Sequence, residues 1–236
     1  ENEENKVVDL PILPENHQKI FPIEKSTESY KLENYTKKVY HSLVEKIRKI
    51  LNHMSVCSKG FLVNKVDRSV TGLIAQQQCV GPYQLPLSNY SIIMGEYLSN
   101  VGLVSSIGEK PIIGLYDKKG MVEMTVSEML CNMMFAPVKS LSSINCVANW
   151  MWSSTEPKEA YALRECLDHL VHCVNKLGFS INGGKDSLSM NVKRRKHVIK
   201  APNTLVISGY TNCINIDKKI TPDLKSTTST LLLLKI

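Results

Sequence analysis

Two long amphipathic segments constrain the fold of this chain more than any other feature. The first covers residues 122–135, where apolar side chains recur at helical spacing. The second begins near Pro157, which suits a first helical turn, and ends at Gly178, which suits a helix terminus. Ser154 or Thr155 is expected to cap this second helix. Its expected buried face consists of Leu163, Leu167, Leu170, Val171, Val174 and Leu177.

Short apolar runs around these helices predict strands. They lie at residues 61–63, 70–75, 90–94, 111–116, 179–181 and 205–211. Strands that alternate with two long helices predict an α/β or α+β domain over residues 56–226.

The two ends of the chain are expected to lie outside this domain. Residues 1–35 are rich in Pro, Asn, Glu and Lys, and residues 36–53 carry apolar residues at helical spacing. We therefore expect a linker and a connector helix over 1–55. The leucines at 231–234 predict a buried strand, so 227–236 is expected to be the first strand of a following domain that this chain lacks.

Charge and cysteine content restrict the class of protein. The 236 residues carry a net charge of +7, with 43% hydrophobic and 22% charged residues, as in a soluble globular protein. The positive charge suits an anionic ligand, nucleic acid or an acidic partner. The seven cysteines are widely spaced and form no CxxC pair, which argues against a disulfide framework or a zinc site and favours mostly buried, reduced thiols in the cytoplasm. The chain starts with an acidic, polar segment unlike a signal peptide, and no apolar run approaches the length of a membrane span.

Residues 182–190, with the sequence NGGKDSLSM, combine groups that suit a phosphate. Gly183 and Gly184 let a backbone approach a ligand closely, as in a loop. Lys185 supplies positive charge and Ser187 supplies a hydroxyl. The segment is not a Walker loop, because it lacks the first glycine of that motif and the Ser or Thr after its lysine. The alternative is a tight turn with a surface lysine.

A second candidate is a polar pair in the first helix. Glu128 and Asn132 are four residues apart, so both project from one helix face. A carboxylate beside an amide oxygen suits Mg²⁺. The residues alone favour an ordinary solvated face, because such pairs are common there.

Two other segments have simpler explanations. Trp150 and Trp152 are the only tryptophans, and packing is the usual reason for such a cluster, although Asn149 beside them could face a ligand. The basic run at 193–196 contains no aromatic residue and favours a solvated hairpin over a nucleic-acid site.

Several longer motifs resemble the large, single-chain formylglycinamidine ribonucleotide synthases. They are NKVDRSVTGL at 64–73, QQQCVGP at 76–82, QLPL at 84–87, SIGE at 106–109, NWMW at 149–152, GGKDSLSM at 183–190 and LVIS at 205–208. The resemblance covers residues 40–226 and implies the N-terminal domain of the second of two related halves, each of the aminoimidazole-ribonucleotide-synthetase type. It implies a mixed sheet with helices on one face, whose other face pairs with a related domain.

The resemblance also implies a reaction, that of an ATP-dependent amidoligase of de novo purine biosynthesis. In that family an amide oxygen of formylglycinamide ribonucleotide is phosphorylated, and ammonia from a glutaminase domain displaces the phosphate. The implied cofactors are ATP, or ADP in an auxiliary site, and Mg²⁺. The implied partners are that substrate, the glutaminase domain and the other synthetase-like domains of the same polypeptide. The chain alone is expected to be inactive.

Individual residues match the auxiliary nucleotide site of this family. Lys59 and Ser88 match positions that contact the nucleotide. Glu128 and Asn132 match metal ligands, which reverses the preference for a solvated face. Asn89 stands where the family usually has a metal-binding Asp, and its amide offers an oxygen without the charge.

Other residues match the catalytic site. Asn149 and Gly184 match positions near ATP, and Ser187 matches a serine that contacts the substrate. Lys185 stands at a metal-ligand position of the short-form relatives, but a protonated lysine does not ligate Mg²⁺, so it is assigned to phosphate. Asp186 either binds metal or orients Lys185.

The sequence leaves two alternatives to the enzyme domain open. A non-catalytic structural or interaction module that retains the fold is supported by Asn89. Nucleic-acid binding rests on net charge alone, and neither nucleic acid nor membrane is expected as a partner. The isolated domain would expose an apolar sheet face and is expected to self-associate.

Overall fold

The computed structural model describes residues 43–64, 68, 72–195, 197–226, 228–230 and 232–233. The described residues fall into two units, a smaller one up to residue 62 and a larger one from residue 63 onward. In the smaller unit, α1 (Leu43–Leu51) confirms the C-terminal part of the expected connector helix, and positions 36–42 of that prediction lie outside the described residues. Among the described residues, no helix has the length and apolar character needed to cross a membrane.

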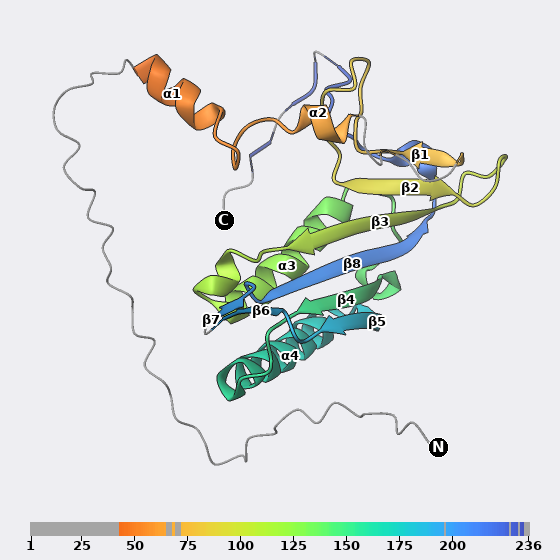
Figure 1. Ribbon diagram of the computed structural model, residues 1–236. Helices are drawn as coiled ribbons and strands as arrows, with labels where there is room; N and C mark the ends of the chain where they lie inside the picture. The colour runs from red at the N-terminus through yellow and green to blue at the C-terminus, as the bar shows by residue number, and fades with distance from the viewer. Residues whose placement is uncertain are drawn as a thin grey trace. The chain divides into compact units, whose positions relative to one another are not determined.

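The larger unit is built on a six-stranded mixed sheet (Figure 1). Across the sheet the strands are β1 (Ile74–Gln76), β2 (Tyr90–Met94), β3 (Gly102–Glu109), β8 (Thr204–Cys213), β4 (Asn145–Met151) and β5 (Ser180–Ser187). Neighbouring strands are antiparallel except β4 and β5, which are parallel. The expected fold class, a mixed sheet with helices on one face, is confirmed.

Two helices pack on the buried face of this sheet. Helix α3 (Lys118–Met133) follows β3 and leads to β4, and α4 (Pro157–Leu177) joins β4 to β5. Gly178 ends α4 with a φ of 77°, as its position predicts. The cap is Glu156, whose side chain makes no capping hydrogen bond, so the prediction of Ser154 or Thr155 was wrong.

The core lies between the sheet and the two helices. Its members include Met121, Val122, Val126, Met129 and Met133 of α3, Leu163, Cys166 and Leu170 of α4, and Ile92, Val104, Cys146, Ala148, Trp150, Leu205 and Ile207 of the sheet. A Cβ on Gly108 would lie 2.1 Å from the Thr125 carbonyl oxygen, so only glycine lets α3 approach β3 this closely. This contact sets the distance between α3 and the end of β3.

Several expected elements differ in the structure. Residues 61–63 belong to a short helix, α2 (Gly60–Val63), and 111–116 contain the 3₁₀ helix η1 (Ile113–Leu115) instead of strands. Strand β3 was missed because Gly102, Ser106 and Gly108 occupy its buried positions and dilute the alternation of apolar residues.

The remaining predicted elements agree with the structure to different degrees. The strands at 90–94 and 205–211 are confirmed, and the strand at 70–75 corresponds to β1, which begins later. The buried face of α4 is narrower than expected, since Leu167, Val171 and Leu177 are exposed. Leu232 and Leu233 are exposed and lie in no strand, and the other two leucines of the 231–234 run lie outside the described residues.

The tryptophans pack in the core, most of the cysteines are buried and the basic run forms a hairpin, as the sequence predicts. Trp152 is fully buried, and its ring lies edge-on to that of Trp150 with centroids 5.8 Å apart. All seven cysteines are free thiols, and Cys79, Cys146, Cys166 and Cys213 are buried. The basic run lies in a hairpin of β6 (Asn191–Arg194) and β7 (His197–Lys200), with Lys196 outside the described residues.

Candidate functional site

A cavity of about 460 Å³ lies where β2 and β3 meet α3. Four residues predicted from the sequence line it: Ser88, Asn89, Glu128 and Asn132. Ser88 and Asn89 directly precede β2, whereas Glu128 and Asn132 project from α3. The fold therefore gathers residues from separate segments into one polar cavity.

Glu128 is held in the cavity by two donors. The Lys110 ammonium forms an ion pair with Oε1, and the backbone N–H of Glu109 donates to Oε2 at 2.8 Å. Partial burial alone would raise the pKa of Glu128, but the hydrogen bonds from Lys110 and Glu109 and the charge of Lys110 outweigh it and lower the pKa. The carboxylate is therefore kept ionised and pointed into the cavity.

Two further oxygen atoms complete the donor set. The Asn132 side-chain N–H donates to the Ile107 carbonyl at 2.9 Å, which leaves the Asn132 amide oxygen available as an acceptor. The Ser88 side chain is buried, and its hydroxyl has no hydrogen-bond partner among the described residues. A buried hydroxyl of this kind is costly unless a ligand satisfies it.

Two positively charged side chains at this cavity, those of Arg68 and Lys110, were not predicted from the sequence. Arg68 lines the cavity, and its guanidinium donates to the Gln84 side chain at 2.5 Å while its buried Nε finds no partner among the described residues. Lys110 reaches Glu128 from the turn after β3. Arg68 lies inside the 64–73 motif and Lys110 directly follows the SIGE motif, so both could have been found by asking which charges flank the motifs.

The cavity fits a divalent cation and an anionic ligand together. Glu128, Asn132 and Asn89 offer carboxylate and amide oxygens, which Mg²⁺ prefers. Arg68 adds a guanidinium, which suits phosphate oxygens. Lys110 already neutralises Glu128, so an incoming cation would share or displace that ammonium.

Lys59 belongs to the smaller of the two units. There its ammonium donates to the Cys57 carbonyl at 2.5 Å. Its contact with a nucleotide stays a prediction.

A second group of predicted residues lies on β4 and β5. In the parallel register Asn149 pairs with Lys185, and Met151 pairs with Ser187. The Lys185 ammonium donates to the Ser187 hydroxyl at 3.0 Å. Because side chains alternate along a strand, Asp186 points to the opposite face of β5 and does not share their surface.

Gly183 and Gly184 lie in β5, so the predicted loop or tight turn was wrong. A Cβ on Gly184 would lie 2.4 Å from the Ala148 carbonyl oxygen, whereas one on Gly183 would meet only a Val147 methyl at 3.6 Å. Gly184 therefore allows β5 to pair closely with β4. Neither glycine has a positive φ, so neither is needed for a bend.

The two groups of candidate residues remain apart in the fold. The cavity lies at β2 and β3, whereas the group of Asn149, Lys185 and Ser187 lies beyond β8 on β4 and β5. The structure thus presents two separate polar sites on one sheet.

Comparisons with known proteins place the chain in a family. The family model described as "FGAR-AT PurM_N-like domain" matches residues 58–212. The phosphoribosylformylglycinamidine synthase of Drosophila melanogaster is 44% identical over 183 residues, covering 78% of this chain and 14% of that protein. The human protein of the same name is 41% identical over 184 residues, covering 78% of this chain and 14% of that protein.

A solved structure of T. maritima PurL complexed with ATP is similar with a TM-score of 0.45 and 16% identity, covering 63% of this chain and 26% of that one. The chain spans about 14% of the length of the curated relatives that it matches. On the match over 58–212 and the identity to these relatives, the chain belongs to the FGAR-AT PurM_N-like domain family.

Proposed function

We propose that the chain is a nucleotide-binding domain of a phosphoribosylformylglycinamidine synthase, acting in the cytoplasm. The proposal is supported by 41–44% identity to synthases of this name from human and fruit fly. The observation that carries it is the cavity, because carboxylate, amide and guanidinium groups line one space together with the Ser88 hydroxyl, which has no hydrogen-bond partner among the described residues.

In this proposal each cavity residue has one role toward a magnesium nucleotide. Glu128, Asn132 and Asn89 hold Mg²⁺ through oxygen atoms, and Mg²⁺ offsets the charge of the phosphates when it is bound. Arg68 and the Ser88 hydroxyl hydrogen-bond phosphate oxygens. Asn89 contributes no charge, so Glu128 is the only carboxylate among these three metal-binding residues.

The group on β4 and β5 has its role in the amidation of formylglycinamide ribonucleotide. The carboxamide oxygen of the glycinamide group attacks the γ-phosphorus of ATP, and ADP leaves. Ammonia then attacks the activated carbon, loses a proton, and phosphate leaves with the former amide oxygen. Lys185 and Asn149 would stabilise the negative charge that develops on the phosphates, and Ser187 would hydrogen-bond the substrate.

The other parts of this reaction would come from outside the chain. The ammonia would come from a glutaminase domain, and related synthetase-like domains would cover the open sheet face. That face carries exposed apolar side chains, among them Leu103 and Ile107.

A second candidate is a domain that keeps a nucleotide for structural reasons and takes no part in the chemistry. The uncharged Asn89 favours it, because it leaves Glu128 as the only carboxylate of the three proposed metal-binding residues. The two candidates agree on nucleotide binding and differ in the role of the group on β4 and β5.

Calorimetric titration of the full chain with ADP, with and without Mg²⁺, tests the shared part. Binding is expected to depend on Mg²⁺ and to weaken about tenfold in Glu128→Gln, since a charged ligand is lost. Glu165→Gln is the matched control, because Glu165 is exposed on α4. Absence of nucleotide binding, or equal binding by both variants, would contradict the proposal.

The catalytic role is tested by placing the chain in the corresponding part of the fruit-fly synthase. A chimera that makes the amidine product and loses at least ~10-fold in kcat on Lys185→Met would support the enzyme domain. Full turnover in that variant would favour the structural candidate.

A further inference from the structure

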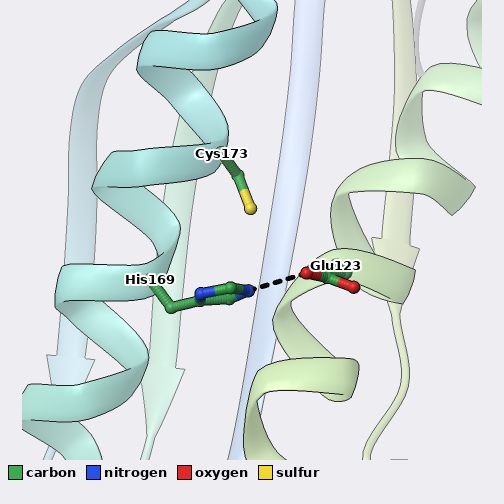
Figure 2. Close-up of side chains that lie close together, drawn as sticks. All are labelled: Glu123, His169 and Cys173. Carbon is green, nitrogen blue, oxygen red and sulfur yellow. Dashed lines mark hydrogen bonds and ion pairs between the residues drawn. The ribbon is translucent and has the colours of Figure 1, made fainter.

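Helices α3 and α4 bring three metal-ligating side chains together on a surface that the cavity does not use. Figure 2 shows Glu123 of α3 facing His169 and Cys173 of α4. One ligand atom from each of the three residues lies within 4.8 Å of the other two. The His169 Nε2 atom and the Glu123 Oε1 atom are 2.9 Å apart and share a hydrogen bond.

The spacing of the two α4 residues is that of a helical metal site. His169 and Cys173 are four positions apart, so both side chains leave α4 on one face, one turn from each other. Glu123 then supplies the third ligand from the neighbouring helix. His169 and Cys173 are partly buried, which limits their rotamers, whereas Glu123 is exposed and free to adjust.

The distances require only small movements around a cation. Zinc binds nitrogen and oxygen at about 2.0–2.2 Å and sulfur at about 2.3 Å, so tetrahedral ligand atoms lie roughly 3.3–3.7 Å apart. The Nε2 to Oε1 distance would have to open from 2.9 Å, and no pair has to close from more than 4.8 Å. Rotation of the exposed Glu123 side chain supplies the first change, and small side-chain movements within the cluster supply the second.

Charge in the cluster also favours a divalent cation. A divalent cation would take the place of the thiol proton, and two negative ligands with one neutral imidazole would balance its charge. Thiolate and imidazole together select Zn²⁺ and similar borderline metals over Mg²⁺ or Ca²⁺.

We propose that Glu123, His169 and Cys173 form a binding site for Zn²⁺ or a metal of the same class, which ties α3 to α4. Water would fill the fourth position. The site goes beyond the proposed nucleotide function. Cysteine spacing does not predict this site, because only one ligand is a cysteine and the three ligands come from two helices.

Titration of the metal-free full chain with Co²⁺, followed by absorption, tests the proposal. With excess Mg²⁺ present to occupy the oxygen ligands of the cavity, Co²⁺ is expected to give one sulfur-to-cobalt charge-transfer band with tetrahedral visible bands, saturating at one ion per chain and displaced by Zn²⁺. Cys173→Ser should remove the charge-transfer band, and His169→Gln should weaken binding by at least ~10-fold.

Two control variants separate this site from chance binding by exposed groups. Cys131→Ser removes the exposed thiol of α3, and His197→Gln removes an exposed histidine of β7. Both are expected to bind Co²⁺ as the unmodified chain does. A wild-type chain without the charge-transfer band, or a band that survives Cys173→Ser, overturns the proposal. So does a band that Cys131→Ser removes.

Discussion

Lys110 and Glu128 form an ion pair at the edge of the cavity, and the Glu109 backbone N–H donates to the same carboxylate at 2.8 Å. Lys110 comes from the turn after β3 and Glu128 from the middle of α3. The pair therefore joins the end of a strand to a helix and sets the charge of the candidate cation site.

The ion pair should stabilise the fold at neutral pH and lose this effect in acid. The folded-state pKa of Glu128 is lowered, so its contribution is complete above the ordinary value of 4.5 and is lost as pH falls through the lower folded value. A double-mutant cycle of Lys110→Met and Glu128→Gln, measured by urea unfolding, should give a coupling of about 0.2–1 kcal/mol at pH 7. A coupling at pH 3 as large as at pH 7 would refute this explanation.

Removal of Lys110 should strengthen cation binding in the absence of nucleotide. The ammonium and a cation compete for the Glu128 carboxylate, so Lys110→Met is expected to raise Mg²⁺ affinity by up to about fivefold, the equivalent of roughly 1 kcal/mol. Isothermal titration with MgCl₂ measures the change. Lys176→Met on α4 serves as the control for the loss of one positive charge, and weaker binding by Lys110→Met would show that Lys110 helps to hold the cation.

Substitution of the adjacent glycines of β5, Gly183 and Gly184, tests how closely β5 approaches β4. Gly184→Ala would place a methyl 2.4 Å from the Ala148 carbonyl oxygen and should destabilise the fold by about 1–3 kcal/mol. Gly183→Ala makes only an ordinary contact with Val147 and should change stability by less than about 1 kcal/mol. Urea unfolding of both variants provides the measurement. Equal effects would mean that the close approach of β5 to β4 does not constrain position 184.

Thiol reactivity should follow burial. Burial raises the pKa of Cys146 to about 12 and that of Cys166 to about 11, the latter partly opposed by the charge of Lys118. Because the thiolate is the reactive form, both should resist iodoacetamide at pH 8 while exposed Cys131 is alkylated first. Mass spectrometry of the modified peptides identifies the order. Early modification of Cys146 in the native chain would contradict the packing described for β4.

The sequence predicts the helices better than the strands of this fold. Helical periodicity identifies α3 and α4 because their apolar faces are long, and Gly178 marks the end of α4 correctly. Strand β3 escapes because glycine and serine fill buried positions where α3 packs closely. The glycines of β5 suggest a loop because backbone contact across a sheet leaves no local signal.

The residues of the candidate site also differ in how well the sequence predicts them. Glu128 and Asn132 share a helix face, so their spacing alone predicts that they act together. The position of Ser88 and Asn89 beside them depends on how β2 pairs with β3, and only the motif resemblance suggests it. Arg68 reaches the cavity by a long-range fold contact that no periodicity reveals.

The close contact of Gly108 with α3 affects both sites to which this helix contributes a carboxylate, the cavity and the cluster with α4. Glu123 and Glu128 are five positions apart, so their side chains leave α3 about 140° from each other, one toward α4 and one toward the cavity. A rigid rotation of the helix that improved one set of contacts would impair the other. As long as the Thr125 carbonyl lies against Gly108, such a rotation is blocked. The position of one carboxylate can then change without the other only through substitution of individual side chains.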